Sequence, residues 1–118
     1  MKQSDKDALI DMCGAALQIG TYMSGKDRAE FMADAMRQDA VIRQLEIIGE
    51  AVTRLTSEFK LTIPAIPWRN MSGLRNILIH AYDHVDLDQV WTIATNYAPQ
   101  LIHDLKAIPG MNLDDEIE

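Results

Sequence analysis

A short stretch in the second half of the chain carries side chains whose chemistry is complementary. Arg75 and Asn76 stand side by side in an otherwise apolar run, His80 follows four residues after Asn76, and Tyr82 comes two residues later. Arginine binds phosphate as a planar fork, and histidine exchanges a proton near neutral pH. The stretch therefore predicts phosphate chemistry, with RNA as the favoured substrate.

Helical geometry sorts this stretch into faces. At about 100° per residue, its apolar positions form one face that should pack in the core; these positions are Leu74, Ile77, Leu78 and Ala81. Asn76 and His80 form a second line and Arg75 and Tyr82 a third, both off the predicted core face. The polar side chains are thus expected on one connected arc of a helix.

Ile79 stands in the middle of this polar arc. A face in contact with water has no need of an isoleucine, so we expect an apolar cover, and the simplest cover is the same helix from a second subunit. A two-fold dimer would bring two copies of Arg75, Asn76 and His80 into one cleft. The sequence therefore predicts a homodimer with the site at its interface.

Such a cleft could cleave RNA by internal attack of the 2′-hydroxyl. This reaction needs a base that takes the proton of the 2′-hydroxyl and an acid that protonates the leaving 5′-oxygen, and the two His80 side chains of a dimer could fill these roles. Arg75 would stabilise the charge that develops on the phosphate, and Asn76 would orient the histidine or the phosphate. We predict no metal ion and no other cofactor, because the sequence offers no convincing cluster of metal ligands.

Structural roles are the alternative for these groups. Most single histidines in helices are structural or exposed, and we assign His84 and His103 in this way. Arg75 could instead join two helices through a salt bridge to Glu46 or Glu50. Such a pair would not exclude catalysis.

The composition bounds the class of protein. The 118 residues are 47% hydrophobic, which suffices for one domain with a real core. The single cysteine, Cys13, allows no internal disulfide and should be a small buried hydrophobic residue on the first helix. The N-terminus has no apolar signal segment and no stretch is long enough to span a membrane, so we predict a soluble, cytoplasmic protein.

The charge is uneven along the chain. The net charge of −7 argues against non-specific binding of nucleic acid over the whole surface. Residues 37–75 nevertheless carry six basic and four acidic side chains, so this part is +2 and the remainder is −9. A local basic site is compatible with this pattern, and Arg43, Arg54 and Arg69 are candidates for lining an RNA path.

The hydrophobic pattern is helical nearly throughout. It predicts helices over residues 4–23, 27–34, 35–59, 68–82 and 87–108. The expected fold class is therefore all-α, an up-and-down bundle of four main helices and one short helix. We expect a single domain over residues 1–110 and an acidic, frayed tail over residues 111–118.

Caps and breaks define the predicted helix ends. Ser4 and Asp7 have the spacing of a capping box for the first helix, and Asp86 should cap the fifth. Pro99 should kink that fifth helix. The third helix carries a coiled-coil-like apolar seam, formed by Val41, Leu45, Ile48, Val52, Leu55 and Phe59.

The polar stretch resembles the signature of HEPN domains of the HepT type, which is Arg-Asn, three further residues, His, any residue and Tyr. Three further segments are similar to this family, namely residues 39–51 (DAVIRQLEIIGEA), residues 67–71 (PWRNM), and Val85-Asp86 with Trp91. Members of the family are ribonuclease toxins of toxin–antitoxin pairs. The resemblance covers essentially the whole chain.

The resemblance implies a helical-bundle dimer with its cleft at the subunit interface. It implies a metal-independent endoribonuclease activity carried by Arg75 and His80, with Asn76 in support. It also implies a partner, a minimal nucleotidyltransferase antitoxin that transfers AMP from ATP onto the motif tyrosine, here Tyr82. Bulk and negative charge added beside Arg75 would block an anionic substrate. The acidic net charge would suit pairing with a more basic partner.

Other functions stay open at this level. The chain could be a non-catalytic accessory or binding subunit of a minimal nucleotidyltransferase, or a structural helical dimer without a ligand. Arg75, Asn76 and His80 together favour catalysis, since a pure binding module need not keep them all. Tyr82, taken without the family, could be a residue at the rim of the core with its hydroxyl in water. The sequence does not define the RNA target, tRNA or mRNA, or the stoichiometry of a larger hetero-oligomer with the antitoxin.

Overall fold

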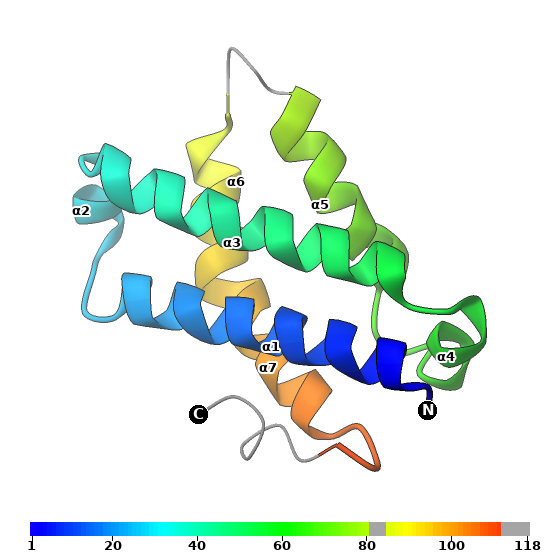
Figure 1. Ribbon diagram of the computed structural model, residues 1–118. Coiled ribbons are helices and arrows are strands. Elements are labelled where there is room, and N and C mark those ends of the chain that lie inside the picture. The colour runs from blue at the N-terminus through cyan, green and yellow to red at the C-terminus, as the bar shows by residue number, and fades with distance from the viewer. Residues whose placement is uncertain (81–84, 112–118) are drawn as a thin grey trace.

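The computed structural model of the chain describes residues 1–80 and 85–111, with side chains placed for residues 1–74 and 85–111. All secondary structure in these residues is helical, which confirms the predicted all-α class (Figure 1). The elements are α1 (Gln3–Met23), α2 (Arg28–Met32), α3 (Ala35–Arg54), α4 (Ser57–Thr62), α5 (Trp68–His80), α6 (Leu87–Thr92), the π-helical turn η1 (Ile93–Tyr97) and α7 (Ala98–Lys106).

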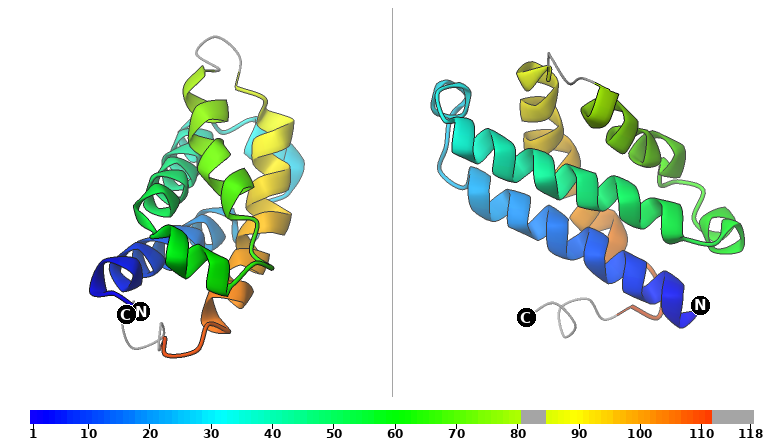
Figure 2. Two further views of the ribbon diagram at one scale, coloured as in Figure 1. Left: turned by 90° about the vertical axis from the view of Figure 1, so that its right-hand side faces the viewer. Right: turned by 45° about the horizontal axis from the view of Figure 1, so that its top comes forward.

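Four rods make up the bundle. Helices α1 and α3 lie side by side and antiparallel, and α5 packs against α3 (Figure 1). Helices α6 and α7, joined through η1, form a continuous rod that crosses behind this pair, and α7 packs against α1 (Figure 2). None of the helices in the described residues combines the length and the apolar character needed to cross a membrane.

The core lies between these rods. All six residues of the predicted α3 seam are buried, and Cys13 of α1 is fully buried, as the sequence predicts. Helix α1 adds its own apolar stripe, which includes Leu9, Met12 and Ile19. Burial of such a continuous apolar face is the main source of stability for the bundle.

The predicted third helix is wrong in its extent. Helix α3 ends at Arg54, Leu55 has extended backbone (φ −71°, ψ 139°), and a separate helix, α4, begins at Ser57. The break occurs because the Thr56 side chain caps α4 by accepting a hydrogen bond from the Phe59 N–H at 3.2 Å. The bundle therefore has two short helices, α2 and α4, at opposite ends of the molecule, where one was expected (Figure 1).

The predicted capping box of the first helix is also wrong. Helix α1 begins at Gln3 with Lys2 at the N-cap and no side-chain cap, so Ser4 lies inside the first turn. Asp7 accepts a hydrogen bond from the Gln3 side chain at 2.8 Å instead. Asp5 points inward from this turn, and its carboxylate accepts bonds from the Thr56 N–H at 2.7 Å and the Thr56 hydroxyl at 2.8 Å. This contact ties the start of α1 to the cap of α4.

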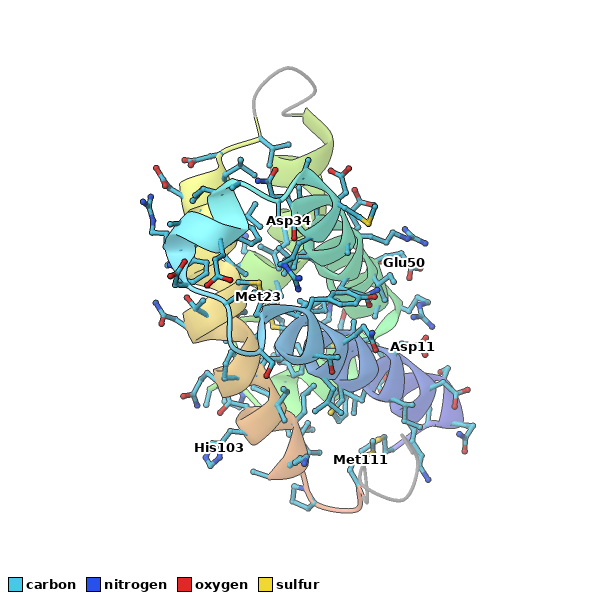
Figure 3. The ribbon with its side chains drawn as sticks, turned by 90° about the vertical axis from the view of Figure 1, so that its left-hand side faces the viewer. Asp11, Met23, Asp34, Glu50, His103 and Met111 are labelled. Atoms are coloured by element: carbon cyan, nitrogen blue, oxygen red, sulfur yellow. The ribbon has the colours of Figure 1, made fainter. Side chains whose placement is uncertain are left out.

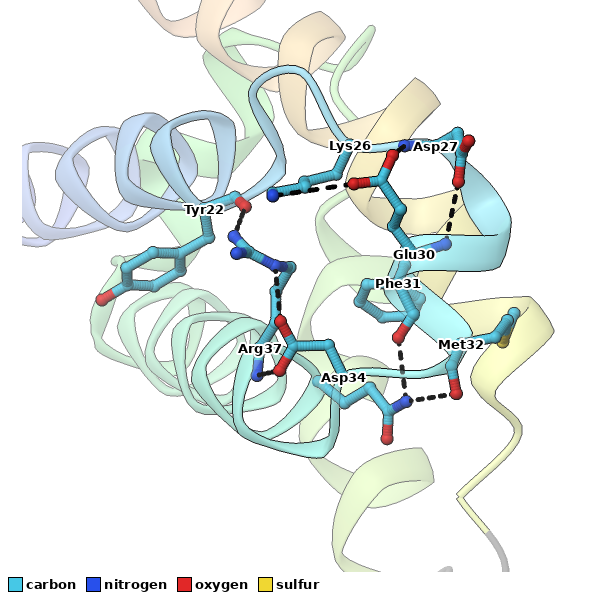
Figure 4. A network of polar contacts seen from close by, with 9 residues as sticks. Tyr22, Lys26, Asp27, Glu30, Phe31, Met32, Asp34 and Arg37 are labelled. Atoms are coloured by element: carbon cyan, nitrogen blue, oxygen red, sulfur yellow. Dashed lines mark hydrogen bonds and ion pairs between the residues drawn. The ribbon is translucent and has the colours of Figure 1, made fainter.

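A polar network fixes the turn between α1 and α3 (Figure 4). Asp34 caps α3 through the Arg37 N–H at 3.0 Å and also pairs with the Arg37 guanidinium at 3.1 Å, which in turn donates to the Tyr22 carbonyl. Asp27 and Glu30 form a capping box at the start of α2. The hydrogen bonds of this capping box stabilise α2, which is too short to be stable through its own helical hydrogen bonds.

The sequence predicts a kink at Pro99, and the structure has a π-helical turn directly before this residue. Pro99 stands in the first turn of α7, directly after η1, and the Ala98 N–H bonds to the Ile93 carbonyl, five residues back. Proline lacks an N–H and its ring clashes with the carbonyl four residues earlier in an α-helix. The wider π-helical turn absorbs this conflict, so the rod continues through the proline. Asp86 caps α6 as predicted, accepting from the Asp88 and Gln89 N–H groups.

Candidate active site

Helix α5 is anchored at its start by a tryptophan. The Trp68 indole N–H donates to the carbonyls of Lys60 at 3.1 Å and Ile63 at 3.0 Å, and its ring lies 6.0 Å from the ring of Phe59. These carbonyls lie in the last turn and at the C-cap of α4, and each also accepts one backbone N–H, from Ile63 and Ile66 respectively. Trp68 is 8% exposed and therefore caps one helix while it begins the next. Trp68 is thus a packing residue.

The next turns of α5 pack against α3. Met71 is fully buried and Leu74 is 7% exposed, which confirms the predicted core position of Leu74. The helical backbone continues without a break through His80. Arg75, Asn76 and His80 therefore stand on one regular helix, with the spacing assumed in the sequence analysis.

The structure places the backbone of these residues but does not describe their side chains. The side chains of Arg75, Asn76 and His80 lie outside the described residues, and so do the whole of Tyr82 and His84. Their chemical roles thus remain predictions from the sequence.

The helical register relates these positions to described neighbours. Arg69 precedes Asn76 by seven residues and His80 by eleven, so at about 100° per residue the three positions fall within about 40° of one another. The Arg69 side chain is exposed. The stripe of α5 on which the positions of Asn76 and His80 lie thus begins with the solvent-exposed Arg69.

The register places Arg75 differently. Trp68 and Met71 precede it by seven and four residues, and both are buried. The buried face of α5 is therefore wider, in its first turns, than the face predicted from Leu74, Ile77, Leu78 and Ala81. The position of Arg75 falls between those of Trp68 and Met71 around the helix, whereas Asn76 and His80 follow the exposed stripe.

The other arginines suggested for an RNA path differ in their surroundings. Arg43 is largely exposed on α3 and pairs with Glu46 at 3.5 Å. Arg54 bridges Asp11 of α1 at 2.8 Å and Glu50 at 3.3 Å, and the hydrogen bond to Asp11 raises the pKa of Arg54 above its usual value. Two carboxylates neutralise Arg54, which makes it a poor ligand for phosphate.

Both carboxylates proposed as alternative partners of Arg75 already have a described partner. Glu46 pairs with Arg43 and Glu50 with Arg54, each on helix α3. His103 lies exposed near the end of α7, on the outside of the molecule (Figure 3). Within the described residues, no group of three or more His, Cys, Asp or Glu side chains is arranged to hold a metal ion.

Arg69 and Lys60, like Lys2 near the N-terminus, differ from the paired cations of the described residues. Arg69 and Lys60 have no ion pair or side-chain hydrogen bond with any described residue, whereas Lys26, Arg28, Arg37, Arg43 and Arg54 each pair with a carboxylate. Arg69 is among the arginines that the sequence predicts for an RNA path, whereas Lys60 is not. Lys60 precedes Arg69 by nine residues across a proline-containing loop, and nothing in the local sequence shows that the two line one surface.

Comparison with known proteins identifies the family of this chain. The family model described as "Ribonuclease HepT-like" matches residues 12–108. A protein of Thermococcus cleftensis named "Probable ribonuclease HepT" is 42% identical over 101 residues, which are 86% of this chain and 92% of that protein. A protein of Methanocaldococcus jannaschii named "Putative RNase MJ1380" is 36% identical over 107 residues, covering 91% of this chain and 98% of that protein.

A further M. jannaschii protein, named "Putative RNase MJ0125", is 33% identical over 107 residues, which are 91% of this chain and 92% of that protein. No solved structure matches the chain. The match of the family model over most of the chain, and the near full-length relatives, show that the chain belongs to the HepT-like ribonuclease family.

Proposed function

We propose that this protein is a metal-independent endoribonuclease and the toxin of a toxin–antitoxin pair. The observation that carries the proposal is the position of Arg75, Asn76 and His80 on one unbroken helix, α5, inside the region matched to a ribonuclease family. The relatives named as ribonucleases support RNA as the substrate class. Internal attack of the 2′-hydroxyl is the reaction that these side chains suit.

The catalytic roles follow from the chemistry of the side chains. His80 takes the proton of the 2′-hydroxyl, and its copy in a second subunit protonates the leaving 5′-oxygen. Arg75 stabilises the negative charge on the phosphate in the transition state, and Asn76 orients the phosphate or the histidine. This division of roles requires a two-fold homodimer with α5 at the interface.

Regulation would act through Tyr82, two residues after His80. A minimal nucleotidyltransferase antitoxin transfers AMP from ATP to the Tyr82 hydroxyl, forming a phosphodiester and releasing pyrophosphate. The added phosphate brings negative charge to the end of the motif helix, where it repels RNA. The net charge of −7 favours association with a more basic partner.

The experiment uses unmodified protein, verified by intact mass, with total tRNA and with mRNA in EDTA. The parent protein should cleave one of these pools, and the His80→Ala variant should leave it intact. His103→Ala is the matched control, because His103 is an exposed histidine at the far end of α7, and this variant should cleave like the parent. Sedimentation at micromolar concentration should show a dimer.

A different result would redirect the assignment. If the unmodified, dimeric parent cuts neither RNA pool, the chain is better described as an accessory subunit of a nucleotidyltransferase. If His80→Ala cuts as well as the parent, His80 has no catalytic role. A monomer at micromolar concentration would remove the acid–base pair across the interface.

A further inference from the structure

A hollow of about 490 Å³ lies at the corner where α4 leads into α5. Its walls are mostly apolar and come from the exposed Leu61, the loop before α5 and the buried indole of Trp68. Lys60 and Arg69 also line it, together with Ser57. The hollow is shallow and open to solvent, so it suits a flat group such as a nucleobase lying against one wall rather than an enclosed ligand.

The charge at the hollow is unusual for this protein. Lys60 and Arg69 have no carboxylate partner among the described residues, although acidic residues outnumber basic ones by 18 to 11 in the chain. No acidic residue lines this hollow within the described part of the chain. Lys60 and Arg69 can therefore bind phosphate, and the apolar wall beside them can contact the face of a base.

The hollow is built from a rigid part of the fold. Pro64 and Pro67 restrict the backbone of the loop, and the Ile66 N–H bonds to the Ile63 carbonyl at 3.3 Å. The Trp68 indole closes the loop through its two carbonyl acceptors, as described above. A preformed wall loses little conformational entropy when a ligand binds, which favours a binding role over an adaptable linker.

The hollow and the motif share helix α5. Arg69 lies eleven residues before His80 on the same stripe, which corresponds to about 16 Å along the axis at roughly 1.5 Å per residue. At about 3.4 Å per stacked nucleotide, a single strand covers this distance in about five nucleotides, and an extended strand in fewer. A strand that reaches His80 can therefore also reach the hollow.

We propose that this hollow is a second RNA subsite, which holds one unpaired base against Leu61 and the two proline rings while Lys60 and Arg69 bind the flanking phosphates. This inference rests on the proposed ribonuclease function and adds the substrate class, RNA that is single-stranded beyond the cleavage position. The subsite selects the strand by the presence of a base about two to five nucleotides from the scissile phosphate.

The test reads base binding directly at Trp68. In a Trp91→Phe background Trp68 is the single tryptophan, and its emission should change when a single-stranded oligoribonucleotide binds. The probe carries a 2′-O-methyl group at every nucleotide, so it cannot be cleaved by internal attack. A set of the same oligonucleotides with one abasic position each should show loss of the signal, and about tenfold weaker binding, for one position only.

Two matched pairs of variants locate the site. Leu61→Glu should weaken binding of the intact oligonucleotide at least about tenfold, whereas Met36→Glu should not. Met36 is a similarly exposed apolar residue in the first turn of α3, close in sequence to α2. Lys60→Ala should lower the slope of log affinity against log salt by about 0.7, the value for one phosphate on a single strand. Lys26→Ala, at the α2 end, should leave the slope unchanged.

The outcomes separate this proposal from the ribonuclease function. If the parent cleaves RNA, but Leu61→Glu and all abasic probes bind like their controls, the second subsite is wrong and the ribonuclease function stands. If the parent fails to cleave, but one abasic position and Leu61→Glu weaken binding, the hollow binds RNA and the ribonuclease function fails. If Leu61→Glu changes the sedimentation of the free protein and not RNA binding, the hollow is an interface between copies of the chain.

Discussion

Replacement of Asp5 by alanine should destabilise the protein strongly, although Asp5 lies in the first turn of the first helix. Asp5 is 2% exposed and accepts two short hydrogen bonds from Thr56, a residue 51 positions away. Hydrogen bonds to a charged group contribute about 1.5–3 kcal/mol each, so two bonds represent about 3–6 kcal/mol. The substitution also removes the cost of burying a carboxylate. We therefore expect the loss in free energy of unfolding to lie at the lower end of this range, at about 3 kcal/mol.

The assay is urea unfolding followed by circular dichroism, with the slope m checked for constancy. For a domain of this size, a loss of about 3 kcal/mol corresponds to a decrease in melting temperature of roughly 12 °C. Asp7→Ala is the matched control, because Asp7 is an exposed aspartate about half a turn along the same helix, and its carboxylate accepts a hydrogen bond from the nearby Gln3 side chain. Its effect should stay within about 0.5 kcal/mol.

A double-mutant cycle isolates the contact itself. Thr56→Val removes the hydroxyl that donates to Asp5 and caps α4, and the cycle with Asp5→Ala subtracts the capping effect. The coupling energy should be about 1–3 kcal/mol. Equal effects of Asp5→Ala and Asp7→Ala, or a coupling energy near zero, would refute the assignment of this contact as the link between α1 and α4.

Three further predictions concern single positions. Gly73→Ala should raise the free energy of unfolding by about 0.5–1 kcal/mol in urea titration, because an added Cβ meets no atom within 4 Å and glycine weakens a helix interior; a loss of stability would contradict it. The Arg37 N–H lowers the pKa of Asp34, so this contribution to stability is present above the ordinary pKa of aspartate and is lost as the pH falls through the folded value. Asp34→Asn should therefore flatten the acid limb of the stability curve, and an unchanged limb would argue against the cap. Burial raises the pKa of Tyr97, which should thus contribute stability at moderate pH that is lost as the pH rises through its folded pKa. Tyr97→Phe should remove a component of the phenolate absorbance titration that lies above the ordinary range of tyrosine.

Local patterns predicted the parts of the fold that depend on nearby residues. The α3 seam from Val41 to Phe59 is buried as its spacing indicates, because the side chains of a helix face are fixed by its own period. The same seam concealed the break after Arg54, since Leu55 and Phe59 stay buried on both sides of it. The break depends on Asp5 and Thr56, whose contact over 51 positions leaves no periodic signal in the sequence.

The candidate site divides in the same way. The spacing of Arg75, Asn76 and His80 on a helix could be predicted because α5 is regular, and the structure confirms the helix. The partners of the arginine side chains could not be predicted, because the pairing of Arg54 with Asp11 joins two helices, α3 and α1, that are far apart in the sequence. In the same way, only the folded structure shows that Arg69 has no carboxylate partner among the described residues.

The central claim is that His80 cleaves RNA by helping the 2′-hydroxyl attack the adjacent phosphate. The most direct measurement is the identity of the ends produced in EDTA by the unmodified parent and by His80→Ala. The parent should produce 2′,3′-cyclic phosphate and 5′-hydroxyl ends, and a substrate with a single 2′-deoxynucleotide at the cleavage position should resist cleavage there. His80→Ala should produce no such ends. Products with 3′-hydroxyl and 5′-phosphate ends, or equal cleavage by His80→Ala, would contradict the account.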